Sequence, residues 1–232
     1  MGFVAAEARE FDGFLANAER VVKLDWPLRF ARMVWLNGRA GLLVANGPGS
    51  KLAGQALDVL RGKQLNFELT GLVSTGFCGA LDKTLEPCDI FVANQLLTAT
   101  SVHELSPIAT KRKYKTGKLL SIDRVASTAA EKLELRNTGA DAVEMEAAAV
   151  AAKANEWNLP FYAIRVVTDT AAEGFPLDFN LMRDSAGRFD RSKIIRAALR
   201  RPGVIFPELM KLNKRCKSAA KALGEFIADC RL

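Results

Sequence analysis

The chain has 232 residues, of which 49% are hydrophobic and 25% charged; this is typical of one large folded domain and excludes a disordered protein. Its four cysteines are scattered without a C-x-x-C pair or a histidine cluster, so we expect reduced thiols and neither a metal site nor a disulfide framework. The net charge of +7 is concentrated from Arg183 onward, whereas the first three quarters of the chain are nearly balanced.

The N-terminal residues include Glu7, Arg9, Glu10 and Asp12, which is not the pattern of a secretory leader. No run of about 18 apolar residues is present that could span a bilayer. We therefore expect a soluble, cytoplasmic protein.

The first clear structural signal is a hairpin within Arg32–Asn46, where Asn37-Gly38 separates two apolar runs. The next segment, Ser50–Arg61, has a helical pattern with Ser50 as a candidate cap and Gly62 as its end. Further strands are expected at Leu69–Thr75, Asp89–Ala93, Lys118–Asp123 and Phe161–Thr168, with an alanine-rich helix at Ala147–Glu156. This alternation predicts an α/β fold: a single three-layer domain over residues 1–232, with a mixed central sheet flanked by helices.

The C-terminal region differs in character from the rest. A loop-like stretch follows Asp169, and then two helical stretches are separated by Arg201-Pro202-Gly203. In the second stretch six apolar residues recur at helical spacing: Leu209, Leu212, Cys216, Ala220, Leu223 and Ile227. Residues 183–232 are thus predicted to form a basic helical extension packed on the domain.

Three glycine- or acid-rich segments follow predicted strands, where open α/β sheets place their ligands. Glu7, Arg9 and Glu10 could orient an anion or a water, or could simply form an acidic first helical turn. Gly47 and Gly49 precede a helix whose free N–H groups suit an oxyanion such as phosphate, although many such loops bind nothing. The small residues of Ser74–Leu81 indicate close approach either of a planar or sugar ligand or of another part of the chain.

The most specific pattern pairs Val143-Glu144-Met145-Glu146-Ala147 with Arg165-Val166-Val167-Thr168-Asp169. Carboxylates in such apolar surroundings are costly to bury without partners. Glu146 could accept hydrogen bonds from vicinal hydroxyls, and Asp169 could donate a proton to a leaving group. Helix capping together with an ion pair to Arg165 is the structural alternative.

With the G-x-C-G-A-L stretch at Gly76–Leu81, these motifs resemble, in order and spacing, the superfamily of purine nucleoside phosphorylases and methylthioadenosine/adenosylhomocysteine nucleosidases. The resemblance extends over nearly the whole chain. Ala5–Arg9 and the Arg200-Arg201-Pro202-Gly203 tail look most like the hopanoid-associated phosphorylases.

The resemblance implies roles for individual residues. Glu146 would hold the ribose hydroxyls above Met145, and Asp169 would be the general acid for the departing purine, with Thr168 where relatives often have serine. Gly47, Gly49 and Arg9 would bind phosphate, and the nucleophile would be directed by Glu10, as in nucleosidases, or by Glu7 and Arg9. The remaining substrate-binding candidates are Glu144, Phe77, Cys78, Gly79 and Val125.

Two positions depart from the family pattern. Phe77 stands where relatives carry a serine or threonine that touches phosphate or ribose, so no hydroxyl is available there. Val125 is the residue nearest to the place where relatives stack an aromatic ring on the base. Both departures favour a substrate other than an ordinary small purine nucleoside.

The leading hypothesis is phosphorolysis of a 5′-substituted adenosine, with adenosylhopane as the substrate if the hopanoid resemblance holds and phosphate as co-substrate. The alternatives are a nucleosidase acting on methylthioadenosine or adenosylhomocysteine, and a binding module for nucleosides or lipids without catalysis. Nothing in the sequence calls for a cofactor. No nucleic-acid partner is expected, because the basic tail lacks interleaved aromatics. We expect a homo-oligomer of undetermined size, and the basic C-terminal helix meets either membrane lipid or a subunit interface.

Overall fold

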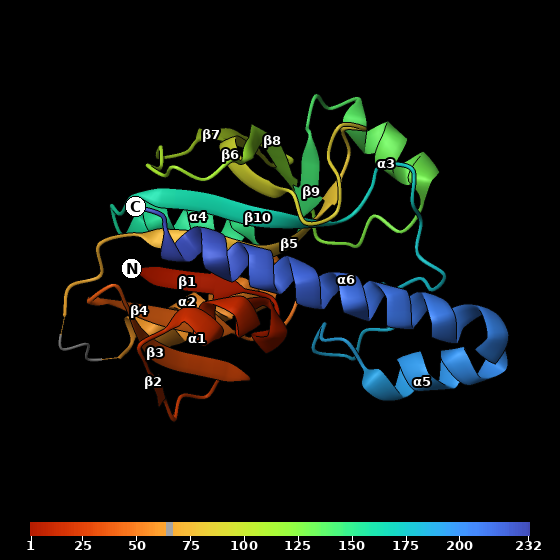
Figure 1. Ribbon diagram of the computed structural model, residues 1–232, viewed down its shortest axis with the longest axis horizontal. Helices are drawn as coiled ribbons and strands as arrows, with labels where there is room; N and C mark the ends of the chain where they lie inside the picture. The colour runs from red at the N-terminus through yellow and green to blue at the C-terminus, as the bar shows by residue number, and fades with distance from the viewer. Residues whose placement is uncertain (64–66) are drawn as a thin grey trace.

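The computed structural model describes residues 1–63 and 67–232 (Figure 1). In chain order the strands are β1 (Gly2–Ala5), β2 (Arg20–Lys23), β3 (Phe30–Leu36), β4 (Arg39–Ala45), β5 (Leu72–Ala80), β6 (Ile90–Leu97), β7 (Val102–Glu104), β8 (Lys115–Ser121), β9 (Ala142–Glu144) and β10 (Phe161–Asp169). The helices are the 3-10 turn η1 (Ala8–Phe11), α1 (Asp12–Asn17), α2 (Ser50–Arg61), α3 (Ala129–Arg136), α4 (Ala147–Glu156), α5 (Arg191–Arg200) and α6 (Pro202–Ala228).

The strands form one mixed sheet in the order β10-β6-β8-β9-β5-β1-β4-β3-β2, and β7 pairs with β6. Because β10 also pairs with β5, five of these strands close on themselves while the others continue as an open sheet. Strands β1, β5 and β10 run parallel, so their carboxyl ends lie at one edge. This is the edge where the sequence motifs meet.

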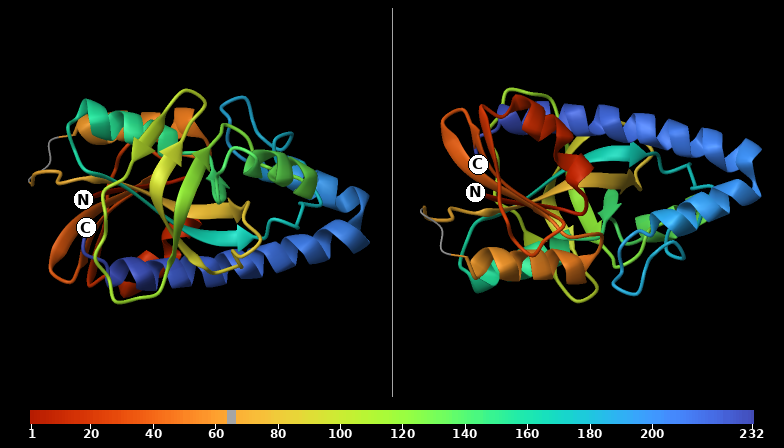
Figure 2. Two further views of the ribbon diagram at one scale, coloured as in Figure 1. Left: turned by 90° about the horizontal axis from the view of Figure 1, so that it is seen from above. Right: turned by 90° about the horizontal axis from the view of Figure 1, so that it is seen from below.

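Helices cover the sheet on both faces, which gives the three predicted layers (Figure 2). On one face, α2 and α4 bury the side chains of Leu57 and Val150, among others, against the sheet. On the other face, α1 and α6 bury Phe14, Leu223 and Phe226. The α/β class and the mixed, helix-flanked sheet are therefore confirmed.

The predicted Asn37-Gly38 hairpin is present: β3 and β4 pair antiparallel with Leu36 opposite Arg39. Both turn residues have positive φ, at 50° and 71°, as a tight hairpin turn requires. The predicted helices Ser50–Arg61 and Ala147–Glu156 have the predicted bounds.

Some local predictions were wrong. Ser50 is not the cap of α2: Gly49 occupies that position, and the Ser50 hydroxyl donates to the carbonyl of Met145 at 3.2 Å. Strand β5 starts three residues later than predicted and continues to Ala80, because β10 pairs with it as far as Gly79. The glycine-rich motif thus lies within a strand instead of following it.

The C-terminal helix α6 is only partly an extension. Its second half, which includes Cys216, Ala220 and Leu223, is buried in the core against α1 and the sheet. Its first half projects beyond the sheet and packs against α5 (Figure 1). The apolar stripe predicted from the sequence is therefore mostly an internal packing surface.

The contact between α1 and α6 depends on two glycines. A Cβ atom at Gly224 would overlap the backbone of Gly13, and a Cβ atom at Gly13 would overlap the carbonyl of Ala220. We expect Gly224→Ala to lower the free energy of unfolding by about 1–3 kcal/mol, since the helices must separate. Gly54→Ala, inside α2 and facing open space, is the control and should stabilise by up to about 1 kcal/mol. Urea denaturation measures both, and equal effects would contradict the close packing.

Candidate active site

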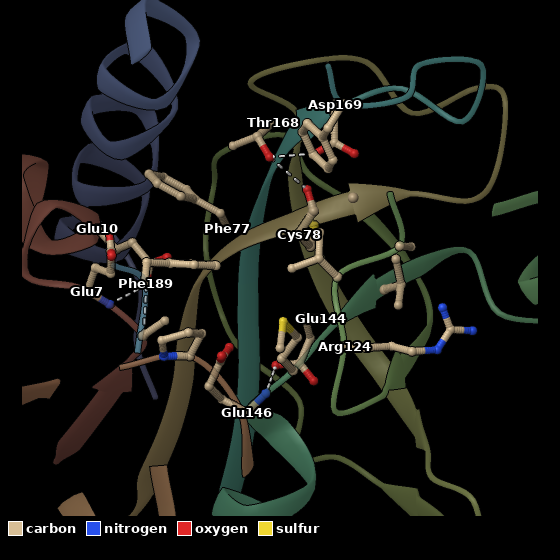
Figure 3. A pocket seen from close by; sticks show the side chains of 18 of the residues that line it. Glu7, Glu10, Phe77, Cys78, Arg124, Glu144, Glu146, Thr168, Asp169 and Phe189 are labelled. Carbon is tan, nitrogen blue, oxygen red and sulfur yellow. Dashed lines mark hydrogen bonds between the residues drawn. The ribbon is translucent and has the colours of Figure 1, made fainter. Parts of the chain in front are cut away.

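A cavity of about 160 Å³ opens at the carboxyl ends of β1, β5 and β10 (Figure 3). Its walls include the turn after β1, the end of β5, the β9–α4 junction and the end of β10, which are distant in sequence. Further lining residues come from the loop before α3, from α3 itself and from the loop after β10. Most predicted site residues line it: Glu7, Arg9, Glu10, Phe77, Cys78, Gly79, Val125, Glu144, Met145, Glu146, Thr168 and Asp169.

Behind the cavity lies Arg165, a fully buried arginine on β10. Its guanidinium is paired with the carboxylates of Glu144 and Glu146, and it also donates to the Thr75 carbonyl at 2.9 Å and the Ser74 hydroxyl at 2.5 Å. A buried charge without such partners would be strongly destabilising. The arginine therefore fixes two acidic residues on neighbouring elements.

Glu144 has mainly a structural place in this arrangement. Its carboxylate accepts the backbone N–H groups of Glu146 and Ala147 at the start of α4, at 2.8–3.1 Å, in addition to its pair with Arg165. Its side chain is 0% exposed. The capping and ion-pair alternative thus describes Glu144, which supports the site more than it contacts a ligand.

The carboxylate of Glu146 has fewer hydrogen-bond partners than that of Glu144. One carboxylate oxygen accepts the N–H of Gly49 at 2.9 Å, and the other lies 3.3 Å from Nη1 of Arg165. A carboxylate has about four acceptor positions, so two remain for a ligand. Burial raises the pKa of Glu146 to about 7, partly offset by Arg165.

Glu10 sits in η1, next to the end of β1, and is also buried. Its Oε2 accepts the N–H of Ala6 at 2.9 Å. Burial, with the nearby charge of Glu146 as the second cause, raises the pKa of Glu10 to about 8. A group with this pKa is suited to accept a proton near neutral pH.

Two glycines of β5 make room for carboxylates. A Cβ atom at Gly76, where φ is 120°, would lie 2.5 Å from Oε2 of Glu10, and one at Gly79 would lie 2.9 Å from Oδ2 of Asp169. The close approach predicted for this motif is thus an approach of side chains of the chain itself.

Asp169 ends β10 and forms a buried ion pair with a lysine that no sequence motif indicates. Nζ of Lys132, on α3, lies 2.5 Å from Oδ2 of Asp169 and 2.8 Å from the carbonyl of Thr170. The Thr168 hydroxyl lies 2.7 Å from Oδ1 of Asp169. Lys132 is 1% exposed and lines the cavity, so the pair forms one wall of it. No feature of the local helical pattern distinguishes this lysine from a solvated one.

The outer part of the cavity carries aromatic and charged residues. Phe175 and Phe189 come from the loop after β10, and Phe77 comes from β5. Arg9 lies above the Phe77 ring, 5.8 Å from its centroid, and pairs with Glu7 at 2.8 Å. Neither Phe175 nor Phe189 could be identified from the sequence, because both lie in a segment without regular secondary structure. His103 on β7 lies outside the cavity lining.

The Gly47–Gly49 loop, which was predicted to bind phosphate, uses its backbone N–H groups for hydrogen bonds within the chain. The N–H of Gly47 donates to the Ala6 carbonyl at 2.9 Å, and that of Gly49 donates to Glu146. Neither glycine lines the main cavity. Gly47 does line an adjacent cavity of about 240 Å³, together with Arg9, Arg29, Arg188 and Arg191.

Residues 103–199 match the family model of the Phosphorylase superfamily. The predicted resemblance to that superfamily is confirmed. No curated protein sequence matches the chain.

Solved structures with the same fold include S-adenosylhomocysteine nucleosidase from Streptococcus pyogenes in complex with 5-methylthiotubericidin, at 17% identity and a TM-score of 0.72 over 98% of this chain and 94% of that chain. Another is 5′-methylthioadenosine/S-adenosylhomocysteine nucleosidase from Neisseria meningitidis with methylthio-immucillin-A, at 19% identity and a TM-score of 0.69 over 98% and 96%. A futalosine hydrolase mutant of Helicobacter pylori aligns at 16% identity and a TM-score of 0.68 over 97% and 95%.

The raised pKa of Glu10 predicts a pH-dependent stability. The neutral form of a carboxyl with a raised pKa is favoured by folding, so its stabilising contribution is complete below the unfolded pKa and is lost as pH rises through about 8. Glu10→Gln stays neutral and should therefore gain stability relative to the parent between about pH 6 and about pH 9, by at least about 1 kcal/mol. Thermal unfolding at both pH values measures this, with Glu19→Gln at the surface as control. An equal stability difference between Glu10→Gln and the parent at the two pH values would contradict a buried, titrating Glu10.

Proposed function

We propose that the chain cleaves the N-ribosidic bond of a 5′-substituted adenosine, with water as the nucleophile. The observation that carries the proposal is the grouping, around one cavity, of buried Glu10 and Glu146 with the Asp169–Lys132 pair. The three carboxylates come from three separate elements and lie around the same space (Figure 3). The reaction needs such an arrangement, because a base, a sugar-binding group and an acid act on one substrate.

Glu146 is proposed to accept hydrogen bonds from the ribose hydroxyls. As the bond to the purine breaks, the ribosyl carbon gains positive charge, and a carboxylate on its hydroxyls then binds more strongly. The Gly49 N–H and Arg165 hold Glu146 in one orientation, so little reorganisation is needed at that step.

Glu10 is proposed to remove a proton from the attacking water. The base must be ionised to do so; its pKa of about 8 makes the ionised form a strong acceptor, and the ionised fraction grows as pH rises from neutral towards 8. Three features favour water over phosphate here: the Gly47 and Gly49 amides already have acceptors, and Phe77 offers no hydroxyl.

Asp169 is proposed to deliver the proton that the departing purine needs at N7. Lys132, in contact with Oδ2 of Asp169, supplies that proton, so the pair acts as one donor unit. As the C1′–N9 bond breaks, its electrons pass to the purine, the water oxygen bonds to C1′, and the water proton goes to Glu10. After each turnover Glu10 releases its proton to solvent and the Lys132 ammonium is restored from solvent, so the two proton transfers balance.

The 5′-substituent is proposed to lie along the aromatic part of the cavity formed by Phe77, Phe175 and Phe189. Apolar rings favour an apolar group, such as the methylthio group of methylthioadenosine or a longer hydrocarbon as in adenosylhopane. The analogues in two of the structural neighbours carry methylthio groups by name, which supports the smaller candidate.

Phosphorolysis is the second candidate. The observation in its favour is the adjacent cavity beside Gly47, where four arginines could bind phosphate. A binding module without catalysis is disfavoured by the buried carboxylates, which cost stability unless they serve the site.

One assay separates these candidates. Purified protein is incubated with methylthioadenosine, adenosylhomocysteine or adenosylhopane, with and without phosphate, and released adenine is quantified. Equal release without phosphate, with the unphosphorylated 5-substituted ribose as the sugar product, supports hydrolysis. Release that requires phosphate would replace hydrolysis by phosphorolysis, and no release from any of these nucleosides would contradict the enzymatic proposal.

Removal of the acid should lower turnover while sparing binding. Asp169→Asn is expected to reduce kcat by about 10²–10⁴-fold with a small change in KM, since the general acid acts only as the bond breaks. Lys132→Met should give a reduction of the same order, and Asp169→Asn added to it should cost little more. Steady-state kinetics measures all three variants; additive losses would show that the two residues do not act as one unit.

The proposed base predicts the pH profile. Because Glu10 must be ionised to accept a proton, kcat/KM should rise with pH and level off above about 8. Glu10→Gln should reduce kcat/KM by about 10²-fold or more and remove this rise. A profile that falls between neutral pH and about pH 8 in the parent would contradict the role.

A further inference from the structure

Helices α5 and α6 form a hairpin that projects from the body of the molecule. Figure 1 shows α5 and the first half of α6 side by side, beyond the end of the sheet. Ala198 of α5 and Ile205 of α6 pack in a small cluster with Leu177 of the loop after β10, and Ile194 and Leu209 lie at its edge. The hairpin therefore has a small apolar interior that it shares with that loop.

Further apolar side chains lie on the outside of this hairpin. Ile195 is 59% exposed, Leu199 67%, Val204 62%, Phe206 53% and Met210 65%. Within the described residues these are half of the exposed large hydrophobic side chains, although the hairpin is a small part of the chain. Ile195 and Leu199, like Phe206 and Met210, are four residues apart and so share one side of their helix.

The same surface is strongly basic. Between Arg191 and Lys214 there are seven basic residues and one acidic residue, Glu208. All seven are exposed: Arg191, Lys193, Arg196, Arg200, Arg201, Lys211 and Lys214. We name the exposed apolar and basic side chains of residues 191–214 the hairpin surface.

We propose that the hairpin surface docks on an anionic lipid bilayer. Apolar side chains flanked by lysine and arginine are the combination that inserts into the boundary between headgroups and acyl chains of acidic membranes. No helix of the described residues is long and apolar enough to cross a membrane, so the contact is peripheral.

The hairpin surface could instead bind a second copy of the chain or a nucleic acid, and its combination of charge and apolar side chains favours the bilayer over both. A symmetric contact with a second copy would place two such basic surfaces together, and like charges oppose it. A nucleic acid would satisfy the charge but would leave Ile195, Leu199 and Met210 against a polar backbone. An anionic bilayer satisfies both parts of the surface.

The hairpin is connected to the lining of the cavity, so docking at a bilayer would place the cavity near the lipid. Phe189 lines the cavity, and α5 begins at Arg191, two residues further on. In α6, the guanidinium of Arg215 forms a bidentate ion pair with the carboxylate of Glu173 in the loop after β10, with both N–O distances 2.8 Å. A docked hairpin thus brings the aromatic part of the cavity close to the lipid, where an apolar substrate would partition.

The test is co-sedimentation of the full-length protein with vesicles. We expect binding to phosphatidylcholine vesicles that contain about one third phosphatidylglycerol to be at least about 10-fold stronger than to phosphatidylcholine alone, and to weaken as salt is raised. The variant with Ile195→Gln, Leu199→Gln, Phe206→Gln and Met210→Gln should lose about 10-fold or more of that binding. Glutamine keeps helix propensity, and thermal unfolding checks the fold.

A matched control carries Val102→Gln and Leu133→Gln, two side chains of similar exposure outside the hairpin, at 61% and 63%. It should bind vesicles like the parent protein. A second variant with Arg196→Gln, Arg200→Gln, Lys211→Gln and Lys214→Gln should lose the preference for phosphatidylglycerol.

The proposal is overturned if the parent protein does not sediment with the anionic vesicles, or if the four-glutamine apolar variant binds them equally. It is also overturned if light scattering shows that the apolar variant converts an oligomer to a monomer, or if the parent binds DNA in preference to vesicles. Vesicle binding is measured without a nucleoside, so its result is independent of the proposed reaction.

Discussion

The arrangement of the site depends on one buried cation. Arg165 stands in the middle of β10 without access to solvent and is paired with Glu144 and Glu146, with Glu10 close by. Several kcal/mol of desolvation cost are associated with each buried ion, and only mutual pairing compensates them. Strand β10 and the start of α4 are therefore held in register by charge as well as by packing. If Arg165 were lost, three acidic groups would be left together in an apolar interior.

The buried carboxylates also require two glycines on β5. Gly76 and Gly79 lie where Glu10 and Asp169 approach β5, and any side chain there would displace a carboxylate. The same strand thus forms the core of the sheet and the floor of the cavity. The carboxylates of Glu10 and Asp169 are thus positioned against the β5 backbone, which moves less than side chains do.

The sequence predicted the layers, the hairpin at Asn37-Gly38 and helices α2 and α4, because hydrophobic period and turn residues are local signals. It also singled out Glu146 and Asp169, since acids in apolar runs need an explanation, whereas Glu10 was a candidate through the resemblance to nucleosidases. It could not predict Lys132, whose burial is set by a strand 37 residues further along the chain. Nor could it show that two amides of the Gly47–Gly49 loop are already bonded, or that the apolar stripe of α6 faces inward, because both depend on tertiary contacts.

The packing of Gly224 against Gly13 joins the last helix to the first. The turn that carries Glu10 leads directly into α1, and α6 packs on both. During synthesis on the ribosome, this turn therefore emerges about two hundred residues before its packing partner. The chain can complete its sheet before α6 is made, but Glu10 acquires its final surroundings only when α6 has left the exit tunnel. Assembly of the site is therefore a later event than formation of the sheet.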